Sequence, residues 1–112
     1  MLLEKTTRLN LLYDFYQDLL TEKQRQYMEL YFQDNYSFGE IAEAFGISRQ
    51  AVYEHIKRAE QSLEEYEEKL QLLAKYQQRK VILDEIQLIL KQRQDKTCNE
   101  IQAKIELLRQ ID

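Results

Sequence analysis

Apolar side chains recur along this chain every three or four residues, which is the period of an α-helix. One such stripe predicts a first helix from about residue 6 to residue 17, and it contains Leu9, Leu12, Tyr13, Tyr16, Leu19 and Leu20. A second stripe predicts a helix over about 22–33, with Tyr27, Leu30 and Tyr31 facing inward. An amphipathic helix needs a partner for its apolar face, so these helices are expected to pack on one another.

Polar residues with the spacing of a capping box mark where helices begin. Three pairs have this spacing: Thr21 with Gln24, Ser37 with Glu40, and Thr97 with Glu100. The first pair begins the second helix, and the second pair begins a short helix that ends near Phe45. The third pair predicts a final helix after the loop QRQDKTCN, with an apolar stripe of Ile101, Ile105, Leu108 and Ile111.

The stretch from residue 49 to about residue 92 holds no proline or glycine, so nothing in its backbone chemistry ends a helix. A near-heptad stripe comes first, formed by Val52, Ile56, Ala59, Leu63, Tyr66, Leu70 and Leu73. After the polar segment AKYQQRK, a stripe resumes in a shifted phase with Val81, Ile82, Ile86, Ile89 and Leu90. This pattern leaves two alternatives, which are one long helix with a phase slip or two helices hinged between Ala74 and Lys80.

The segment SFGEIAEAFGISRQAVYEHIKRAE, residues 37–60, has the features of a helix-turn-helix, in which two short helices cross at a steep angle. Ala42 supplies the small side chain at the crossing, Gly46 accepts the left-handed conformation of the turn, and Ser48 caps the second helix. The predicted motif core consists of Ile41, Ala42, Phe45, Gly46, Ile47, Val52 and Ile56.

The outward side of the second motif helix carries side chains that suit nucleic acid. With Val52 and Ile56 facing inward, the residues left outside are Ser48, Arg49, Gln50, Tyr53, Glu54, Lys57 and Arg58. Arginine pairs with a guanine edge and glutamine with an adenine edge, whereas lysine, tyrosine and serine suit backbone phosphates. We predict that these seven residues bind nucleic acid. The alternative interpretation is a solvated helix face without a ligand.

Composition narrows the class of protein. The 112 residues include no proline and two glycines, which removes the usual turns of β-sheets and predicts an all-α fold. One cysteine, Cys98, and one histidine, His55, make neither a disulfide nor a metal cluster nor a nucleophile–base pair, so we expect no enzyme and no cofactor. The N-terminal sequence lacks an uninterrupted apolar run of signal-peptide or membrane-span length, so we expect a cytoplasmic protein without a membrane partner.

The charge balance opposes tight binding to DNA. The chain has 16 basic and 20 acidic side chains, and residues 21–60 contain two more acids than bases. Since neutralised phosphates supply most non-specific affinity, one copy of this module should bind DNA weakly. A homodimer that presents two motif helices, or attachment to another nucleic-acid-binding assembly, would offset this weakness.

The segment LTEKQRQYMELYFQDNYSFGEIAEAFGISRQAVYEHIKRAEQSLEEYE resembles region 4 of bacterial sigma factors. The chain as a whole, including EKTTRLNLLYDFYQDLLTEKQRQYMELY near its start, resembles the YlxM family of small bacterial helix-turn-helix proteins. This resemblance implies a sigma-like motif followed by C-terminal helices, and a regulatory role linked to the signal recognition particle pathway. It also implies contacts with promoter bases or backbone at Arg49, Gln50, Tyr53, Glu54 and Lys57.

Together these observations predict an all-α protein with a sigma region 4-like helix-turn-helix domain followed by long C-terminal helices. We expect a helical domain at residues 1–62, with the motif at about 37–60. Residues 63–112 form a C-terminal extension for dimerisation or packing, because its apolar stripes exceed what the first domain can cover. The predicted function is regulation through nucleic acid, with DNA as the main partner, and RNA and signal recognition particle components as further partners. The alternative is a protein interaction module that docks a targeting or transcription component without contacting DNA.

Overall fold

The computed structural model describes residues 2–93 and 95–111, and every regular element in this part of the chain is helical. The elements are α1 (Leu2–Tyr16), the 3-10 turn η1 (Gln17–Leu19), α2 (Glu22–Met28), the π-helical turn η2 (Glu29–Gln33), α3 (Phe38–Phe45), α4 (Arg49–Leu70), α5 (Leu72–Lys91) and α6 (Lys96–Ile111). The predicted all-α fold is confirmed. Among the described helices, none is long and apolar enough to cross a membrane.

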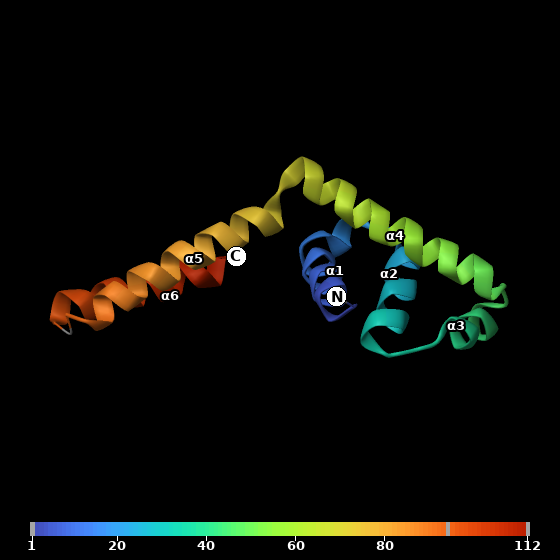
Figure 1. Ribbon diagram of the computed structural model, residues 1–112, viewed down its shortest axis with the longest axis horizontal. Helices are drawn as coiled ribbons and strands as arrows, with labels where there is room; N and C mark the ends of the chain where they lie inside the picture. The colour runs from blue at the N-terminus through green and yellow to red at the C-terminus, as the bar shows by residue number, and fades with distance from the viewer. Residues whose placement is uncertain (1, 94, 112) are drawn as a thin grey trace. The chain divides into compact units, whose positions relative to one another are not determined.

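The helices pack into two compact units. The first unit contains α1 to α4 and ends at Gln71, and the second begins at Leu72 and contains α5 and α6. The expected boundary between residues 62 and 63 therefore lies inside α4. In the first unit, α1, α2 and α3 all pack along α4 (Figure 1).

The core of the first unit follows the predicted stripes closely. The buried side chains are Leu9, Leu12, Tyr13, Tyr16, Leu20, Tyr27, Met28, Ile41, Ala42, Val52, Ile56, Ala59 and Leu63. Leu19 was predicted to belong to this core, but its side chain is 51% exposed. The reason is local, because the chain tightens into η1 at residues 17–19 and the eclipsed geometry of a 3-10 turn shifts its side chains off the α-helical stripe.

The predicted capping boxes are confirmed at α2 and α3. The Thr21 hydroxyl accepts from the Gln24 N–H at 3.1 Å while the Thr21 N–H donates to Gln24 Oε1 at 2.9 Å. Ser37 and Glu40 form the same reciprocal pair. The prediction that Thr97 caps the last helix is wrong, because Asp95 Oδ1 accepts from the Cys98 N–H at 2.8 Å and α6 already begins at Lys96.

The long C-terminal stretch consists of two helices, but the break does not lie between Ala74 and Lys80 as the alternative with a hinge predicted. Helix α4 ends at Leu70 because Gln71 adopts a left-handed conformation, with φ 56° and ψ 31°. The Gln71 N–H donates to the Glu67 carbonyl at 2.8 Å, and α5 begins at Leu72. A left-handed glutamine is uncommon, and the spacing of the apolar residues around Gln71 does not predict it.

A buried polar contact joins α1 to α4. The Tyr16 hydroxyl donates to Glu67 Oε1 at 2.6 Å, and both side chains are buried. Nearer the surface, the Arg8 guanidinium donates to both carboxylate oxygens of Glu64, at 2.9 and 2.8 Å. These bonds supplement the apolar packing by fixing the register of α1 along α4.

High pH is expected to weaken the contact between α1 and the start of η2. Burial and a hydrogen bond from the Tyr13 hydroxyl to Glu29 raise the pKa of Tyr13 from 10.0 to about 12. Because the folded pKa lies above the unfolded one, the neutral hydroxyl contributes stability fully below pH 10, and this contribution is lost as the pH rises from 10 towards 12. Unfolding free energies measured between pH 9 and 12 should therefore fall more steeply for the native chain than for Tyr13→Phe. Parallel curves would contradict this assignment.

Candidate nucleic-acid interface

The turn of the helix-turn-helix is formed by residues 46–48, between α3 and α4. Gly46 is left-handed, with φ 66° and ψ 35°, and the Ile47 N–H donates to the Ala42 carbonyl at 3.1 Å. A Cβ atom at Gly46 would meet nothing within 4 Å, so glycine suits this position for its backbone conformation and not for lack of space. The Ser48 hydroxyl accepts from the Ala51 N–H at 3.0 Å and begins α4, as predicted.

The motif core packs beneath this turn and is supported from α2. Ile41, Ala42, Val52 and Ile56 are buried, and Phe45 and Ile47 are half-buried. The ring of Tyr27, on α2, lies 5.0 Å from the ring of Phe45 and also stacks on the imidazole of His55 at 5.0 Å. His55 is therefore a packing residue that helps to hold α4 against α2.

All seven residues predicted to bind nucleic acid are exposed, namely Ser48, Arg49, Gln50, Tyr53, Glu54, Lys57 and Arg58. Six of them fall on two adjacent stripes of α4 with a spacing of four residues, residues 49, 53 and 57 beside residues 50, 54 and 58. The Gln50 amide nitrogen lies 3.5 Å from Glu54 Oε1, and the Ser48 hydroxyl is engaged in its cap. The remaining side chains of the two stripes present an aromatic ring and three cations on one side of the helix.

Arg49 lies against α3, and a glycine makes this possible. A Cβ atom at Gly39 would come within 3.1 Å of the Nε and Nη2 atoms of Arg49, so the guanidinium rests on the backbone of the first turn of α3. Sequence reasoning explained Gly46 but overlooked Gly39. A signal was present, since a glycine inside a short helix costs about 1 kcal/mol relative to alanine and often marks a close approach.

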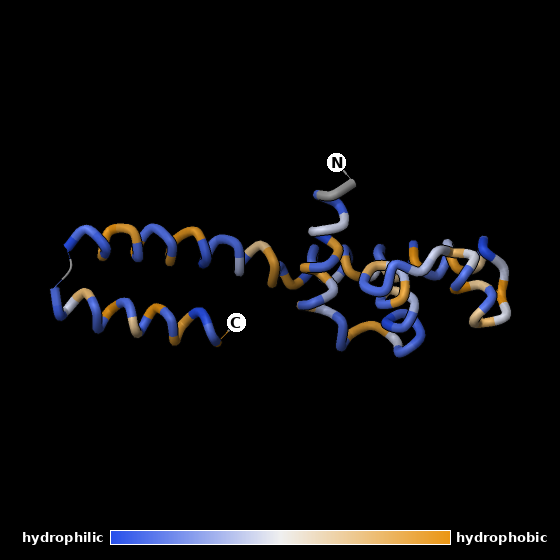
Figure 2. Tube along the Cα trace, turned by 90° about the horizontal axis from the view of Figure 1, so that it is seen from below, coloured by the Kyte–Doolittle hydropathy of each residue, from blue (hydrophilic) through white to orange (hydrophobic). Residues whose placement is uncertain are grey.

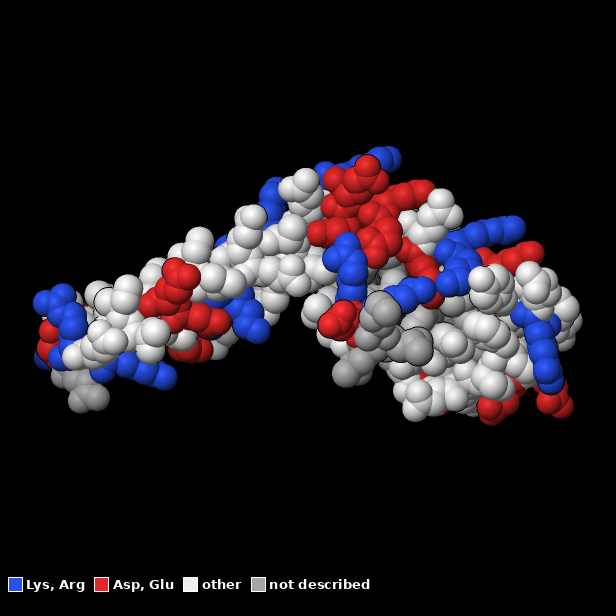
Figure 3. Space-filling view, viewed as in Figure 1, with Lys and Arg blue, Asp and Glu red and all other residues white. Residues whose placement is uncertain are grey.

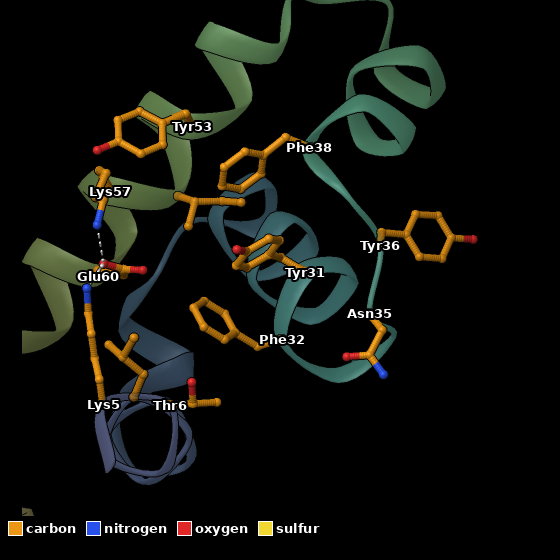
Figure 4. A pocket seen from close by; sticks show the side chains of 12 residues that line it. Lys5, Thr6, Tyr31, Phe32, Asn35, Tyr36, Phe38, Tyr53, Lys57 and Glu60 are labelled. Carbon is orange, nitrogen blue, oxygen red and sulfur yellow. Dashed lines mark ion pairs between the residues drawn. The ribbon is translucent and has the colours of Figure 1, made fainter. Parts of the chain in front are cut away.

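A cleft of about 490 Å³ opens beside Tyr53 and Lys57 (Figure 4). Aromatic rings from three elements follow one another along it. Tyr31 meets Phe32 edge to face at 4.9 Å and stacks on Phe38 at 4.7 Å. Phe38 in turn meets Tyr53 at 5.9 Å, and the Lys57 ammonium lies 5.5 Å from the Tyr53 ring centroid. The cleft thus combines aromatic faces with a cation, which are the groups that bind planar and anionic ligands.

One carboxylate, Glu60, lies between two lysines at the edge of the cleft. Its Oε2 atom is 3.5 Å from Lys57 Nζ and 4.0 Å from Lys5 Nζ, and Figure 4 shows these three side chains across the cleft from Tyr31 and Phe32. The charge of Glu60 raises the pKa of Lys57, so the ammonium stays protonated. Two cations share one anion here, which leaves one positive charge in excess.

The two halves of α4 carry net charges of opposite sign. Residues 49–58 contain two arginines and one lysine against one glutamate, whereas residues 59–70 contain one lysine against five glutamates. Acidic side chains gather over the C-terminal half of α4 (Figure 3), which contains Glu60, Glu64, Glu65, the buried Glu67 and Glu68. The acidity of α4 is therefore concentrated away from the predicted binding stripes, which the summed charge of the sequence does not reveal.

Two crossing helices, a left-handed glycine turn and an exposed second helix define a helix-turn-helix protein. The family model described as "Putative helix-turn-helix protein, YlxM / p13 like" matches residues 3–107, and the chain belongs to this family, UPF0122. The resemblance to the YlxM family is thereby confirmed, and this description names no enzymatic activity.

Relatives from several bacteria match most of the chain. A UPF0122 protein of Halalkalibacterium halodurans is 58% identical over 109 residues, which cover 96% of this chain and 96% of the relative. A UPF0122 protein of Listeria innocua is 52% identical over 109 residues, covering 97% and 98%. One from Exiguobacterium sibiricum is 62% identical over 86 residues, covering 77% and 81%.

Proposed function

We propose that this protein is a regulator that binds nucleic acid through the N-terminal half of α4, with DNA as the main ligand and RNA as the second. The observation that carries this proposal is the exposure of the predicted binding residues together with the concentration of Arg49, Lys57 and Arg58 on that half of the helix. Acidic side chains occupy the other half, so a phosphate backbone would be guided towards the motif turn.

Each group on this surface suits a different part of the ligand. Arg49 and Gln50 lie in the first turn of α4, and in helix-turn-helix proteins the N-terminal residues of the second helix contact base edges. Lys57 and Arg58 lie two turns further along, where they suit phosphates. Tyr53 lies between these positions at the mouth of the aromatic cleft, where its ring can contact a base or sugar.

We further propose that the protein acts in the cytoplasm as a homodimer and takes part in the signal recognition particle pathway. The acidity of the chain supports the dimer, because two binding surfaces in one molecule offset the weak affinity of each. The membership of the YlxM-like family supports the pathway. The homodimer is tested separately from nucleic-acid binding itself.

Removing the charge of Lys57 and removing the charge of Glu60 should change the affinity for nucleic acid in opposite directions. Lys57→Ala removes a phosphate contact and should weaken binding uniformly across sequences, lowering the magnitude of the slope of log affinity against log salt by about 1. Glu60→Gln releases Lys5 and Lys57 from their shared carboxylate and should tighten binding. Binding is measured at several low salt concentrations, with a random-site DNA pool and with signal recognition particle RNA. Lys69→Ala, in the last turn of α4, is the matched control and should change little.

The role of Arg49 is tested by replacing Arg49 itself and by replacing Gly39, on which its guanidinium rests. Arg49→Ala should weaken binding to the preferred sequence by about 5- to 150-fold, the range for one base-reading contact. Gly39→Ala should preserve folding, because the obstructed atoms are the end of a flexible side chain, but should displace the guanidinium and also weaken binding. If the folded native protein shows no saturable binding to either ligand pool, the proposed function is wrong.

A second candidate function rests on the acidic half of α4. Glu64, Glu65 and Glu68 are exposed and Glu60 is half-buried, and together they form a surface that would attract a basic protein, such as a targeting component. Combined replacement of Arg49, Gln50 and Lys57 by alanine distinguishes the two functions. A nucleic-acid reader would lose its cellular phenotype, whereas a protein that docks through its glutamates would keep it.

A further inference from the structure

The second unit is an antiparallel pair of helices with a small core. Helices α5 and α6 lie side by side, with apolar positions recurring along both (Figure 2). Leu90, Cys98 and Ile105 are buried between them, and Leu83 packs against this cluster. Two helices form a single layer, and a stable domain is generally built from at least two packed layers around its core.

One face of this hairpin is closed by polar contacts. Arg109 donates to Asp84 Oδ1 at 2.7 Å and to Gln87 Oε1 at 3.0 Å. Gln87 donates in turn to Glu106 Oε1 at 2.8 Å. These bonds connect α5 to α6 along the side of the hairpin that carries its hydrogen-bonding side chains, and this side is therefore suited to face water.

The other face is apolar and exposed. Its members are Ile82, Ile86 and Ile89 on α5 and Ile101, Leu108 and Ile111 on α6, with side chains between 37% and 79% exposed. The spacing of four and three residues on α5, and of seven and three on α6, places each set on one stripe of its helix. The two stripes meet on the same side of the hairpin, because Ile82, Leu83, Leu108 and Ile111 line a common groove of about 400 Å³.

We propose that this face, defined by Ile82, Ile86, Ile89, Ile101, Leu108 and Ile111, binds the same face of a second copy of the chain to form a four-helix bundle. The proposal rests on the homodimer proposed above and assigns its interface. The heptad-like spacing of both stripes matches the packing of helices in such bundles. Two copies related by a twofold axis bury the same patch on each, so the assembly closes at two copies.

The size of the face agrees with a dimer. Six aliphatic side chains, each exposing on the order of 100 Å², offer roughly 600 Å² per copy. A standard interface buries about 800 Å² per partner, so polar side chains at the rim supply the remainder. Exposed apolar patches of several hundred Å² mark interaction sites in most proteins, which makes a permanently solvated face the less favourable arrangement.

Exposed apolar residues of α5 outside this face provide matched controls. Ile89 is 61% exposed and Leu88 is 63% exposed, but Leu88 points about 100° away from the stripe that contains Ile89. Val81 is 56% exposed and lies seven residues before Leu88 on the same stripe of α5, and Leu108 on the face is 53% exposed. The full-length variants Ile89→Glu/Leu108→Glu and Val81→Glu/Leu88→Glu therefore introduce the same charges at similar exposure on different faces.

Light scattering after size-exclusion chromatography, over a range of protein concentrations, measures the outcome. The native chain and the Val81→Glu/Leu88→Glu control should have twice the 13.6 kDa mass of one chain, and Ile89→Glu/Leu108→Glu should have the single mass. Circular dichroism verifies that each variant is helical. If the glutamate pair on the face unfolds the hairpin, the alanine pair Ile89→Ala/Leu108→Ala replaces it. The dimer dissociation constant should then rise at least about 100-fold, against less than about 3-fold for Val81→Ala/Leu88→Ala.

Two results would overturn the proposal, and they differ in meaning. A native chain that stays monomeric at every concentration removes the homodimer altogether, and with it this interface. A dimer that persists in Ile89→Glu/Leu108→Glu, or that is lost equally in the control, shows that copies associate through another surface. Neither result tests the contacts of α4 with nucleic acid, which are tested with variants of α4 and Gly39 in the first unit.

Discussion

Replacing Leu63 with alanine is expected to lower the free energy of unfolding by about 2–5 kcal/mol. The side chain of Leu63 is 0% exposed and lies on the face of α4 along which α1, α2 and α3 pack. Truncation removes the transfer free energy of the buried methyl groups and leaves a cavity that neighbouring helices fill only in part. Because α4 also carries the predicted binding residues, the loss should reach the motif as well as the core.

Leu70→Ala provides the control for this prediction. Leu70 is also a leucine of α4, but its side chain is 45% exposed. Truncating it should therefore lower the free energy of unfolding by much less than truncating Leu63. Urea unfolding followed by circular dichroism measures both variants against the native chain. Equal losses for the two leucines would mean that α4 is not the central element of the core.

Removing the hydroxyl of Tyr16 is expected to cost about 1.5–3 kcal/mol, the range for a hydrogen bond to a charged group. Tyr16 is 0% exposed and donates to Glu67 Oε1 at 2.6 Å, and Glu67 is itself 7% exposed. In Tyr16→Phe the carboxylate loses this donor in a place where water compensates poorly. Tyr36→Phe, at a tyrosine that is 38% exposed, is the control and should be close to neutral.

A second substitution distinguishes the hydrogen bond from general packing. If the penalty in Tyr16→Phe comes from the carboxylate, replacing that carboxylate should relieve it, so Tyr16→Phe/Glu67→Leu should be more stable than Tyr16→Phe alone. Chemical denaturation of the four members of this cycle gives the coupling free energy. Strictly additive losses would show that the two side chains do not stabilise each other.

The local elements of this fold could be predicted because each depends on residues close in sequence. The capping boxes at Thr21 and Ser37, the left-handed Gly46 and the cap at Ser48 all follow from side-chain and backbone chemistry within a few positions. The failures were also local in origin. Leu19 lies in a 3-10 turn and Gln71 adopts a left-handed conformation. The spacing of the apolar residues does not predict either of these backbone conformations.

The sequence predicted which residues of the candidate site face outward, but it did not predict which other side chains they contact. Helical periodicity alone indicated that residues such as Arg49 and Lys57 face outward on α4. Only the packed structure shows the Arg49 guanidinium on Gly39, or Lys5 sharing Glu60 with Lys57, because Gly39 lies on α3 and Lys5 on α1. The aromatic cleft is likewise assembled from η2, α3 and α4, so no single segment of sequence describes it.

By itself, the sequence determined that the chain is helical, that it contains a helix-turn-helix and which residues of that motif face outward, since periodicity and capping act over one or two turns. The tertiary structure decided which charged groups meet between helices, such as Lys5 and Glu60, and which apolar stripes remain exposed on the α5–α6 hairpin. These properties depend on which surfaces meet after the helices have formed, and contacts between distant segments decide that.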